Sequence, residues 1–339
     1  MRLLLLATGV LALALASAVT AQEAPPPLAE PSVPFPAWLE GLTAEARAKG
    51  FSDSVIRRTL SNLEPLPRVV ESDRNQAELT LTLDRYLGSR LTPAMIRRGR
   101  EMARTHRTLL GRIEKAYGVP RQYLLAIWGI ESRFGRLVGR TPVFRALATL
   151  AWEPRRSALF RGELFDALRM VESGSAEPSR MTGSWAGAMG QTQFMPSSYL
   201  RYASDFDGDG HPDIWTSVPD TLASIASYLK GYGWQTGESW GREIAVTPGL
   251  RTLATDLPKR EMGCYAIRNM TTPNDLSAWR GRGLKRVEGA DLPAADVQAS
   301  LALVGDRAFL VYRNYEALLG YNCAHFYALS VAMLADELR

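Results

Sequence analysis

Hydrophobic positions between Val119 and Gly135 are so dense that they predict a helix buried on nearly every side. The apolar positions are Leu124, Leu125, Ile127, Trp128 and Ile130. Glu131 is the one carboxylate of this segment and stands near its end. Because an apolar wall makes a carboxyl hard to ionise, we expect a raised pKa and a proton held near neutral pH, as a general acid requires. The alternative is a solvated glutamate at a helix end.

The chain before this segment has mostly helical periodicity. Residues 38–112 predict helices that are interrupted at Pro65 and Pro67. Polar and apolar residues alternate over 75–86, which predicts a strand or extended packing. Thr92 followed by Pro93 predicts the capped start of a further long helix.

The pattern changes in the second half of the chain. Residues 141–172 predict two helices around a turn at 152–156, and 219–230 predict another. Between about 242 and 313, short β-prone runs alternate with turns; they are EIAV, CYAI, SLALV and AFLVY. Residues 325–338 predict a closing amphipathic helix. The predicted fold class is therefore mainly α (α+β), a helical body with a small β subdomain.

The N-terminus has the pattern of a signal peptide. Arg2 precedes an apolar run over 3–16, and small residues at 19–21 offer a cleavage site. We therefore expect a signal peptide over 1–21, a Pro/Ala-rich linker over 22–36 and a catalytic domain over 37–339. No cysteine lies near the junction, so we expect no lipid anchor and no transmembrane segment after removal of the leader.

Composition narrows the function classes. The net charge is +5, and most of the basic residues are arginines, which are spread along the chain. This distribution does not indicate a protein that binds nucleic acid. No HExxH, GxSxG or P-loop motif is present. Cys264 and Cys323 leave two alternatives open, one disulfide or two free thiols. Cys323 and His325, two residues apart on a helix, would point to different faces, which argues against a cysteine nucleophile.

A glycine-rich segment, 183–190, lets the backbone approach a ligand closely. It is followed over 193–202 by amides, hydroxyls and aromatic rings, a mixture that suits sugars because ring faces stack on aromatics and hydroxyls need paired donors and acceptors. The alternative is a glycine-rich turn capped by serine.

Residues 205–216 have the arrangement of an EF-hand calcium loop. The alternating carboxylates are Asp205, Asp207 and Asp209. Gly210 occupies the sixth position and His211 the one that supplies a backbone carbonyl, whereas Thr216 replaces the usual glutamate at position twelve. We predict a structural Ca²⁺ that fixes the glycine-rich segment. The alternative is a cluster of Asx turns without metal.

Three motifs in this order, ESRFG with Glu131, GAMGQTQFMPSSY and DFDGDG, resemble those of the membrane-bound lytic murein transglycosylase B family. The resemblance covers roughly 36–339. It implies a lysozyme-like helical core with an α lobe and a small β lobe, in a soluble periplasmic form because the lipidation cysteine is missing. We expect no separate wall-binding module after the catalytic domain.

The resemblance also implies roles for individual residues. Glu131 matches the catalytic acid that later acts as base. The positions that match sugar contacts are Ser184, Gln193, Phe194, Tyr228, Arg155, Arg156, Tyr86, Tyr321 and Asn322. The positions that match calcium ligands are Asp205, Asp207, Asp209 and His211, with Asp220 as the displaced late ligand.

The implied activity is cleavage of the MurNAc-β-1,4-GlcNAc bond of peptidoglycan glycan strands, with formation of 1,6-anhydroMurNAc and with the substrate's own N-acetyl group in place of a second carboxylate. We expect a monomer that works beside cell-wall synthesis proteins. The alternatives are a hydrolytic muramidase of the lysozyme type, a non-catalytic peptidoglycan-binding protein and a calcium-dependent adhesion or sensor module.

Overall fold

The computed structural model describes residues 30–75 and 81–339. The predicted signal peptide and most of the predicted linker lie outside the described residues, and the first helix begins at Phe35. In this part of the chain no single helix is long and apolar enough to cross a membrane, and the two last helices pass that test only as a pair bent by 117°.

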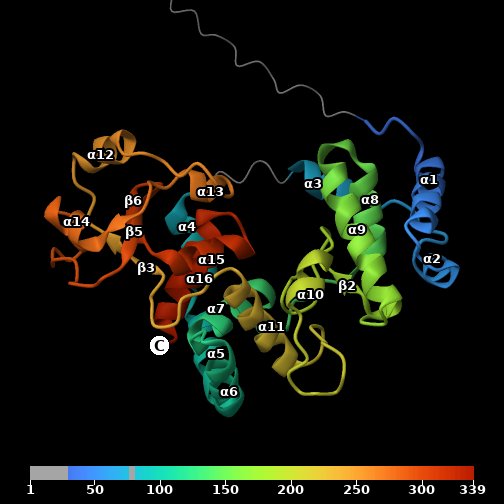
Figure 1. Ribbon diagram of the computed structural model, residues 1–339, viewed down its shortest axis with the longest axis horizontal. Coiled ribbons are helices and arrows are strands. Elements are labelled where there is room, and N and C mark those ends of the chain that lie inside the picture. Colours follow the sequence, from blue (N-terminus) through green and yellow to red (C-terminus); the bar gives the residue numbers. More distant parts are fainter. Residues whose placement is uncertain (1–29, 76–80) are drawn as a thin grey trace, which may run out of the picture.

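One side of the molecule is a helical lobe built on its own apolar core (Figure 1). Its elements are α1 (Phe35–Ala48), α2 (Asp53–Thr59), α3 (Pro67–Asn75), α8 (Val143–Trp152), the 3₁₀ turn η2 (Pro154–Arg156), α9 (Ser157–Glu172), the 3₁₀ turn η3 (Pro178–Arg180) and α10 (Pro196–Tyr202). The helices α8 and α9 pack against each other at its centre. The short strands β1 (Thr141–Pro142) and β2 (Thr182–Gly183) pair antiparallel beside it.

The central helices surround a second core (Figure 1). They are α4 (Leu83–Arg90), α5 (Pro93–Thr105), α6 (Arg107–Tyr117), α7 (Arg121–Ser132), α11 (Val218–Gly231), α15 (Arg313–Tyr321) and α16 (His325–Glu337). Helix α7 lies in the middle and packs against α5, α6, α11 and α16. Nearly all of its side chains are buried, which confirms the helix predicted from its hydrophobic density.

The third part is a small β subdomain with a separate core around Trp279. Its strands are β3 (Gly241–Ile244), β4 (Asn274–Asp275), β5 (Gln298–Val304) and β6 (Arg307–Val311), antiparallel in the order β3-β6-β5-β4. The helices α12 (Leu250–Asp256) and α14 (Leu276–Gly281) complete it, whereas α13 (Tyr265–Arg268), in the same stretch of chain, packs against α15 and the central core. The predicted mainly α fold with a small β subdomain is confirmed.

The helical lobe and the central core meet through α11 and the end of α15. Helix α11 places Leu222 and Ile225 in the central core and Tyr228 in the core of the helical lobe. Tyr321, the last residue of α15, packs against both. Aromatic side chains at this junction are therefore held from two sides.

Helix starts predicted from caps are confirmed. Thr92 caps α5 by accepting a hydrogen bond from the backbone N–H of Met95, with Pro93 as the first helical residue. Helices α8 and α9 flank the predicted turn, and α11 covers the predicted range 219–230.

Three local predictions were wrong. The strand predicted over 75–86 is a helix at its end: residues 83–86 belong to α4, because Thr82 caps a helix whose Leu83 and Leu87 share one buried face. Residues 76–80 of that prediction lie outside the described part of the chain. The run CYAI forms the short helix α13 and not a strand. Helix α16 is buried on most sides and is not amphipathic, because α7, α4 and α15 all pack against it.

Cys264 and Cys323 form a disulfide, which decides between the two alternatives left by the sequence. Their Cα atoms are 6.2 Å apart. The bond joins the residue that precedes α13 to the turn between α15 and α16. It therefore ties the β subdomain to the chain segment that carries Tyr321 and Asn322.

Candidate active site

Glu131 lies in the last turn of α7, where the backbone leaves the helix through residues with positive φ, Arg133 (50°) and Phe134 (58°). The Ser132 hydroxyl donates to the carbonyl of Trp128 and accepts from the N–H of Gly135, which holds this exit in place. The side chain of Glu131 is only partly exposed, beside the buried Ile130. The helix thus presents its carboxylate at the edge of an apolar core.

Removal from water raises the pKa of Glu131 to about 7, from an ordinary value of 4.5. A hydrogen bond from Tyr327 and the positive charge of Arg90 act in the opposite direction and limit the rise. A carboxyl with this pKa holds its proton for about half of the time near neutral pH, which suits a general acid that must later act as a base.

No local sequence pattern pointed to Tyr327, which is in direct contact with Glu131. Its hydroxyl donates to Oε1 of Glu131 at 2.5 Å from the first turn of α16. Burial raises the pKa of Tyr327 well above its ordinary value, and the Glu131 charge adds to the rise, so the phenol remains a donor. Its position in an apolar helix marked it as core, and nothing local distinguishes it from Tyr315.

Three of the predicted sugar-contact residues form one aromatic group beside this pair. The ring of Tyr321 lies 4.6 Å from Tyr228, 5.8 Å from Phe194 and 6.3 Å from Tyr327, measured between centroids. The hydroxyl of Tyr321 donates to the carbonyl of Thr192 at 2.7 Å, which fixes its ring. The structure therefore brings Phe194, Tyr228 and Tyr321 together next to Glu131, through Tyr327.

Two further predicted residues, Tyr86 and Asn322, line a pocket of about 470 Å³. Tyr327 lines the same pocket, so its side chain borders both this hollow and Glu131. The ring of Tyr86 packs against Phe326 at 5.5 Å. Pockets of this size are typical of small-molecule sites.

The predicted residues Ser184 and Gln193 hold the glycine-rich segment in shape. The Ser184 hydroxyl accepts from the N–H groups of Ala186 and Ala188 at 3.3 and 3.1 Å. Gln193 has a positive φ of 52°, and its amide donates to the carbonyls of Val138 and Gly190. The segment is thereby fastened to the loop that follows α7.

A second link between α7 and this segment was not foreseen. Gln191 accepts a hydrogen bond from the indole of Trp128 at 2.8 Å and donates to the carbonyl of Trp215 at 3.0 Å. A side chain at Gly135 would meet the Gln191 amide at 2.4 Å, and Gly135 also has a φ of 80°. Glycine is therefore required where the ESRFG motif ends.

The structure places Arg155 and Arg156 in an ion-pair group of the helical lobe, with Asp73 of α3 as their shared partner. Arg155 forms two hydrogen bonds to the buried carboxylate of Asp73 in α3, at 2.7 and 2.9 Å, and Arg156 pairs with the same group. Burial alone would raise the pKa of Asp73, but the hydrogen bonds and charges of the two arginines bring it below its ordinary value. No sequence motif indicated Asp73 as their partner.

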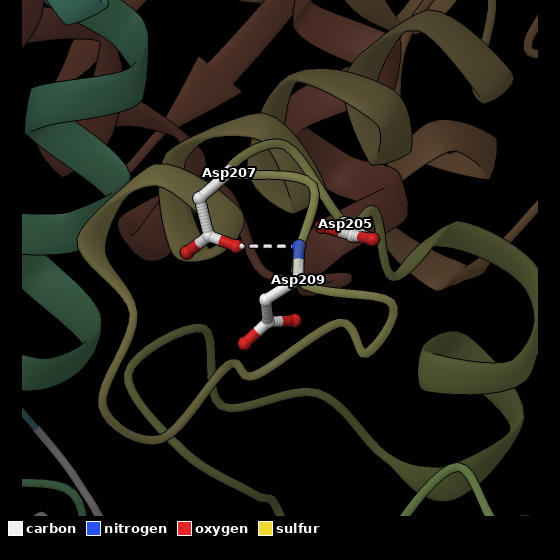
Figure 2. A group of neighbouring side chains, drawn as sticks. All are labelled: Asp205, Asp207 and Asp209. Carbon is white, nitrogen blue, oxygen red and sulfur yellow. Dashed lines mark hydrogen bonds between the residues drawn. The ribbon is translucent and has the colours of Figure 1, made fainter.

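The aspartates of the predicted calcium loop converge, as Figure 2 shows. Carboxylate oxygens of Asp205, Asp207 and Asp209 lie within 4.8 Å of one another, and all three side chains are exposed. Asp205 accepts from the N–H groups of Gly208 and Gly210, and Asp207 accepts from the N–H of Asp209. Like charges this close repel one another, and hard oxygen ligands in such an arrangement suit Ca²⁺.

Asp220 lies outside this group of three. It is fully buried at the start of α11, where Oδ1 accepts from the N–H groups of Phe206 and Asp207 and Oδ2 from that of Asp213. Asp220 thus fastens both ends of the loop through its backbone. His211 is exposed, and its N–H donates to Asp209.

Comparison with known proteins gives the family. The model of the transglycosylase SLT domain matches residues 34–336. Membrane-bound lytic murein transglycosylase B of Escherichia coli (strain K12) is 38% identical over 297 residues, which are 85% of this chain and 78% of that protein.

Solved structures agree with this match. SltB3 of Pseudomonas aeruginosa, in complex with NAG-anhNAM-pentapeptide, is 39% identical with a TM-score of 0.81, and the likeness covers 90% of this chain and 79% of that one. The Escherichia coli lytic transglycosylase Slt35 in complex with calcium is 30% identical with a TM-score of 0.73, over 88% of this chain and 92% of that one. The chain therefore belongs to the transglycosylase SLT domain family and is a lytic murein transglycosylase of the B type, a lyase that acts on peptidoglycan.

Proposed function

We propose that this enzyme cleaves the β-1,4 bond between N-acetylmuramic acid and N-acetylglucosamine, with Glu131 as its single acid and base. The observation that carries the proposal is the environment of Glu131: a carboxyl with a pKa of about 7, held by a tyrosine. The groups that shift its pKa are Tyr327 and Arg90, and neither is a carboxylate. Most glycosidases instead pair two carboxylates across the bond.

The reaction begins with protonated Glu131, which gives its proton to the glycosidic oxygen as the bond from muramoyl C1 breaks. The carbonyl oxygen of the substrate's N-acetyl group bonds to C1 and takes the place of a protein nucleophile. The Glu131 carboxylate then accepts the proton of the C6 hydroxyl, and O6 bonds to C1 as the acetamido oxygen leaves. Glu131 is protonated again, and no water is consumed.

Tyr327 positions the carboxyl for both steps. Its hydroxyl is bound to Oε1, so Oε2 is the oxygen that exchanges the proton with substrate. We propose that a sugar ring packs on Tyr321, the partly exposed member of the aromatic group, and that the buried rings of Phe194 and Tyr228 hold Tyr321 in place. Tyr86 and Asn322 would contact further sugars of the strand in the pocket that Tyr327 also borders.

The soluble products from isolated peptidoglycan sacculi test this proposal. We expect muropeptides that end in 1,6-anhydromuramic acid, each one water lighter by mass spectrometry than the corresponding hydrolysis product. Reducing muramic acid ends would show a hydrolytic muramidase instead. Absence of products from folded protein would favour a non-catalytic wall-binding protein.

We infer that Ca²⁺ binds Asp205, Asp207 and Asp209 and has a structural role. The ion would neutralise converging carboxylates on the loop that joins α10 to α11. The backbone of His211 remains a candidate ligand, whereas the Asp220 carboxylate is occupied by backbone N–H groups.

Calcium should therefore stabilise the protein. At about one hundred times the dissociation constant, a bound ion adds about 2.7 kcal/mol, and thermal unfolding should move up by a few degrees. Magnesium at equal concentration should do less, and Asp205→Asn with Asp209→Asn should abolish the shift. An identical melting temperature with calcium and with chelator would contradict the metal role.

We propose a periplasmic location and an exported chain. The apolar leader motif and the disulfide between Cys264 and Cys323 support it, since structural disulfides persist in oxidising compartments. Glycan strands of peptidoglycan are the proposed partner, and the relative SltB3 was solved with sugar–peptide fragments.

A further inference from the structure

The pocket of about 470 Å³ that Tyr327 borders has an inner end and a rim. Tyr327 is buried at the inner end, where its hydroxyl is bound to Glu131. Tyr265 of α13 lines the same pocket and is 67% exposed, so it forms part of the rim. The function proposed above gives roles to Tyr86 and Asn322 of this pocket and none to Tyr265.

The backbone on both sides of Tyr265 is bound to the segment that carries Asn322. Cys264, which precedes Tyr265, forms the disulfide with Cys323, the residue after Asn322. The N–H of Ala266, which follows Tyr265, donates to Sγ of Cys323 at 3.3 Å. The disulfide therefore holds the exposed ring at a fixed place relative to the pocket. A ring on a fixed backbone loses little conformational freedom when a ligand packs on it.

Further contacts hold α13 on the central core. Ala266 and Met270, on either side of the end of the helix, are fully buried there. Arg260, ahead of the helix, pairs with Glu316 of α15 at 2.9 Å, and both side chains are mostly buried. The N–H of Arg260 also donates to the carbonyl of Met270 at 3.1 Å. The large exposed ring of Tyr265 thus stands on a firmly packed segment.

The chemistry of the pocket suits a neutral sugar. Its lining over the described residues contains no aspartate, glutamate, lysine or arginine, and burial lowers the pKa of His325, so this imidazole is neutral at pH 7. Asn269 lines the pocket together with Tyr265 and follows it by four residues, so the two share one face of α13. An aromatic ring and an amide match the apolar face and the hydroxyls of a sugar, whereas a charged ligand would find no opposite charge here.

We propose that Tyr265 and Asn269 form an additional sugar subsite at the rim of this pocket, so that the enzyme favours long glycan strands over short ones. This inference rests on the function proposed above. A strand with its scissile bond at Glu131 follows the pocket outward, and one of its sugar rings packs on Tyr265 while the Asn269 amide binds the hydroxyls of that sugar. A short fragment ends before the rim and gains nothing from Tyr265.

The test compares two substrates without stem peptides, a tetrasaccharide and long glycan strands, by kcat/KM per cleavable bond. We expect Tyr265→Ala to lower kcat/KM on long strands by about tenfold, mainly by raising KM, and on the tetrasaccharide by less than about twofold. Tyr265→Trp keeps an aromatic face and should keep the preference for long strands. Because Tyr265 is exposed, both variants should fold.

The matched control is Met262→Ala. Met262 is 82% exposed, stands three residues before Tyr265 and lies outside the described lining of the pocket, so its removal should change neither rate. Unchanged activity of Tyr265→Ala on long strands, an equal loss on both substrates, or the same loss in the control would each overturn the subsite. In these cases anhydro products still form, so the proposed function stands. Wild-type products without anhydro ends would instead contradict the proposed function.

Discussion

Glu131→Gln should lower turnover on peptidoglycan by at least about 10²- to 10⁴-fold, the contribution that a general acid typically makes. Glutamine keeps an oxygen that can accept the hydrogen bond of Tyr327, but it has no proton to give to the glycosidic oxygen. The variant should still bind glycan strands, because the aromatic group around Tyr321 is untouched. Product release from sacculi, measured with equal amounts of folded protein, checks this.

The same variant should be more stable than the wild type above neutral pH. The pKa of Glu131 rises on folding from 4.5 to about 7, so the stability that this carboxyl contributes is fully present below about pH 4.5 and is lost as the pH rises through about 7. This shift corresponds to a loss of up to about 3 kcal/mol. The melting temperature of the glutamine variant should therefore exceed that of the wild type at about pH 8 and match it at about pH 4.

An exposed glutamate serves as the matched control for both measurements. Glu261 in the β subdomain is exposed, and Glu261→Gln should leave turnover and its pH dependence unchanged. Wild-type turnover by a folded Glu131→Gln protein would remove Glu131 from the mechanism.

Tyr327→Phe should lower kcat by about tenfold and move the alkaline limb of the pH profile upward. The lost hydrogen bond is one to a charged group, and such bonds contribute about 1.5–3 kcal/mol. Because this bond favours the ionised carboxyl, its removal raises the pKa of Glu131 above about 7. The protonated acid then persists to higher pH, while the carboxyl loses its fixed orientation.

Tyr315→Phe is the control for this change. It also removes a buried hydroxyl from the central core, but its partner is His325, at 3.0 Å, and not Glu131. The control should keep the wild-type pH profile. An unchanged alkaline limb in Tyr327→Phe, or an equal shift in both variants, would show that Tyr327 acts only in packing.

Local sequence patterns were sufficient for parts of this site. Glu131 follows a run of apolar residues, so burial and a raised pKa could be inferred before the fold was known. Asp205, Asp207 and Asp209 alternate within one loop, so their convergence needed no distant partner. Helix starts such as the one at Thr92 could be predicted for the same reason, because the capping side chain bonds to a backbone group only a few residues away.

The features that could not be predicted from the sequence depend on contacts between residues far apart in the chain. Tyr327 reaches Glu131 across 196 positions of sequence, and its orientation is set by the packing of α16 on α7. Asp73 pairs with Arg155 across 82 positions. The run from Tyr265 has β-prone residues, yet it follows a disulfide-bonded residue and closes into one helical turn. Propensity over so short a segment is overridden by tertiary contacts.

The most direct test of the central claim is digestion of purified glycan strands in water labelled with heavy oxygen, followed by mass spectrometry of the new muramic acid ends. If Glu131 takes the proton of the C6 hydroxyl and O6 closes the ring, the new ends are 1,6-anhydro sugars without label. Ends that carry one labelled oxygen would show that water attacked C1, and would contradict the lytic mechanism.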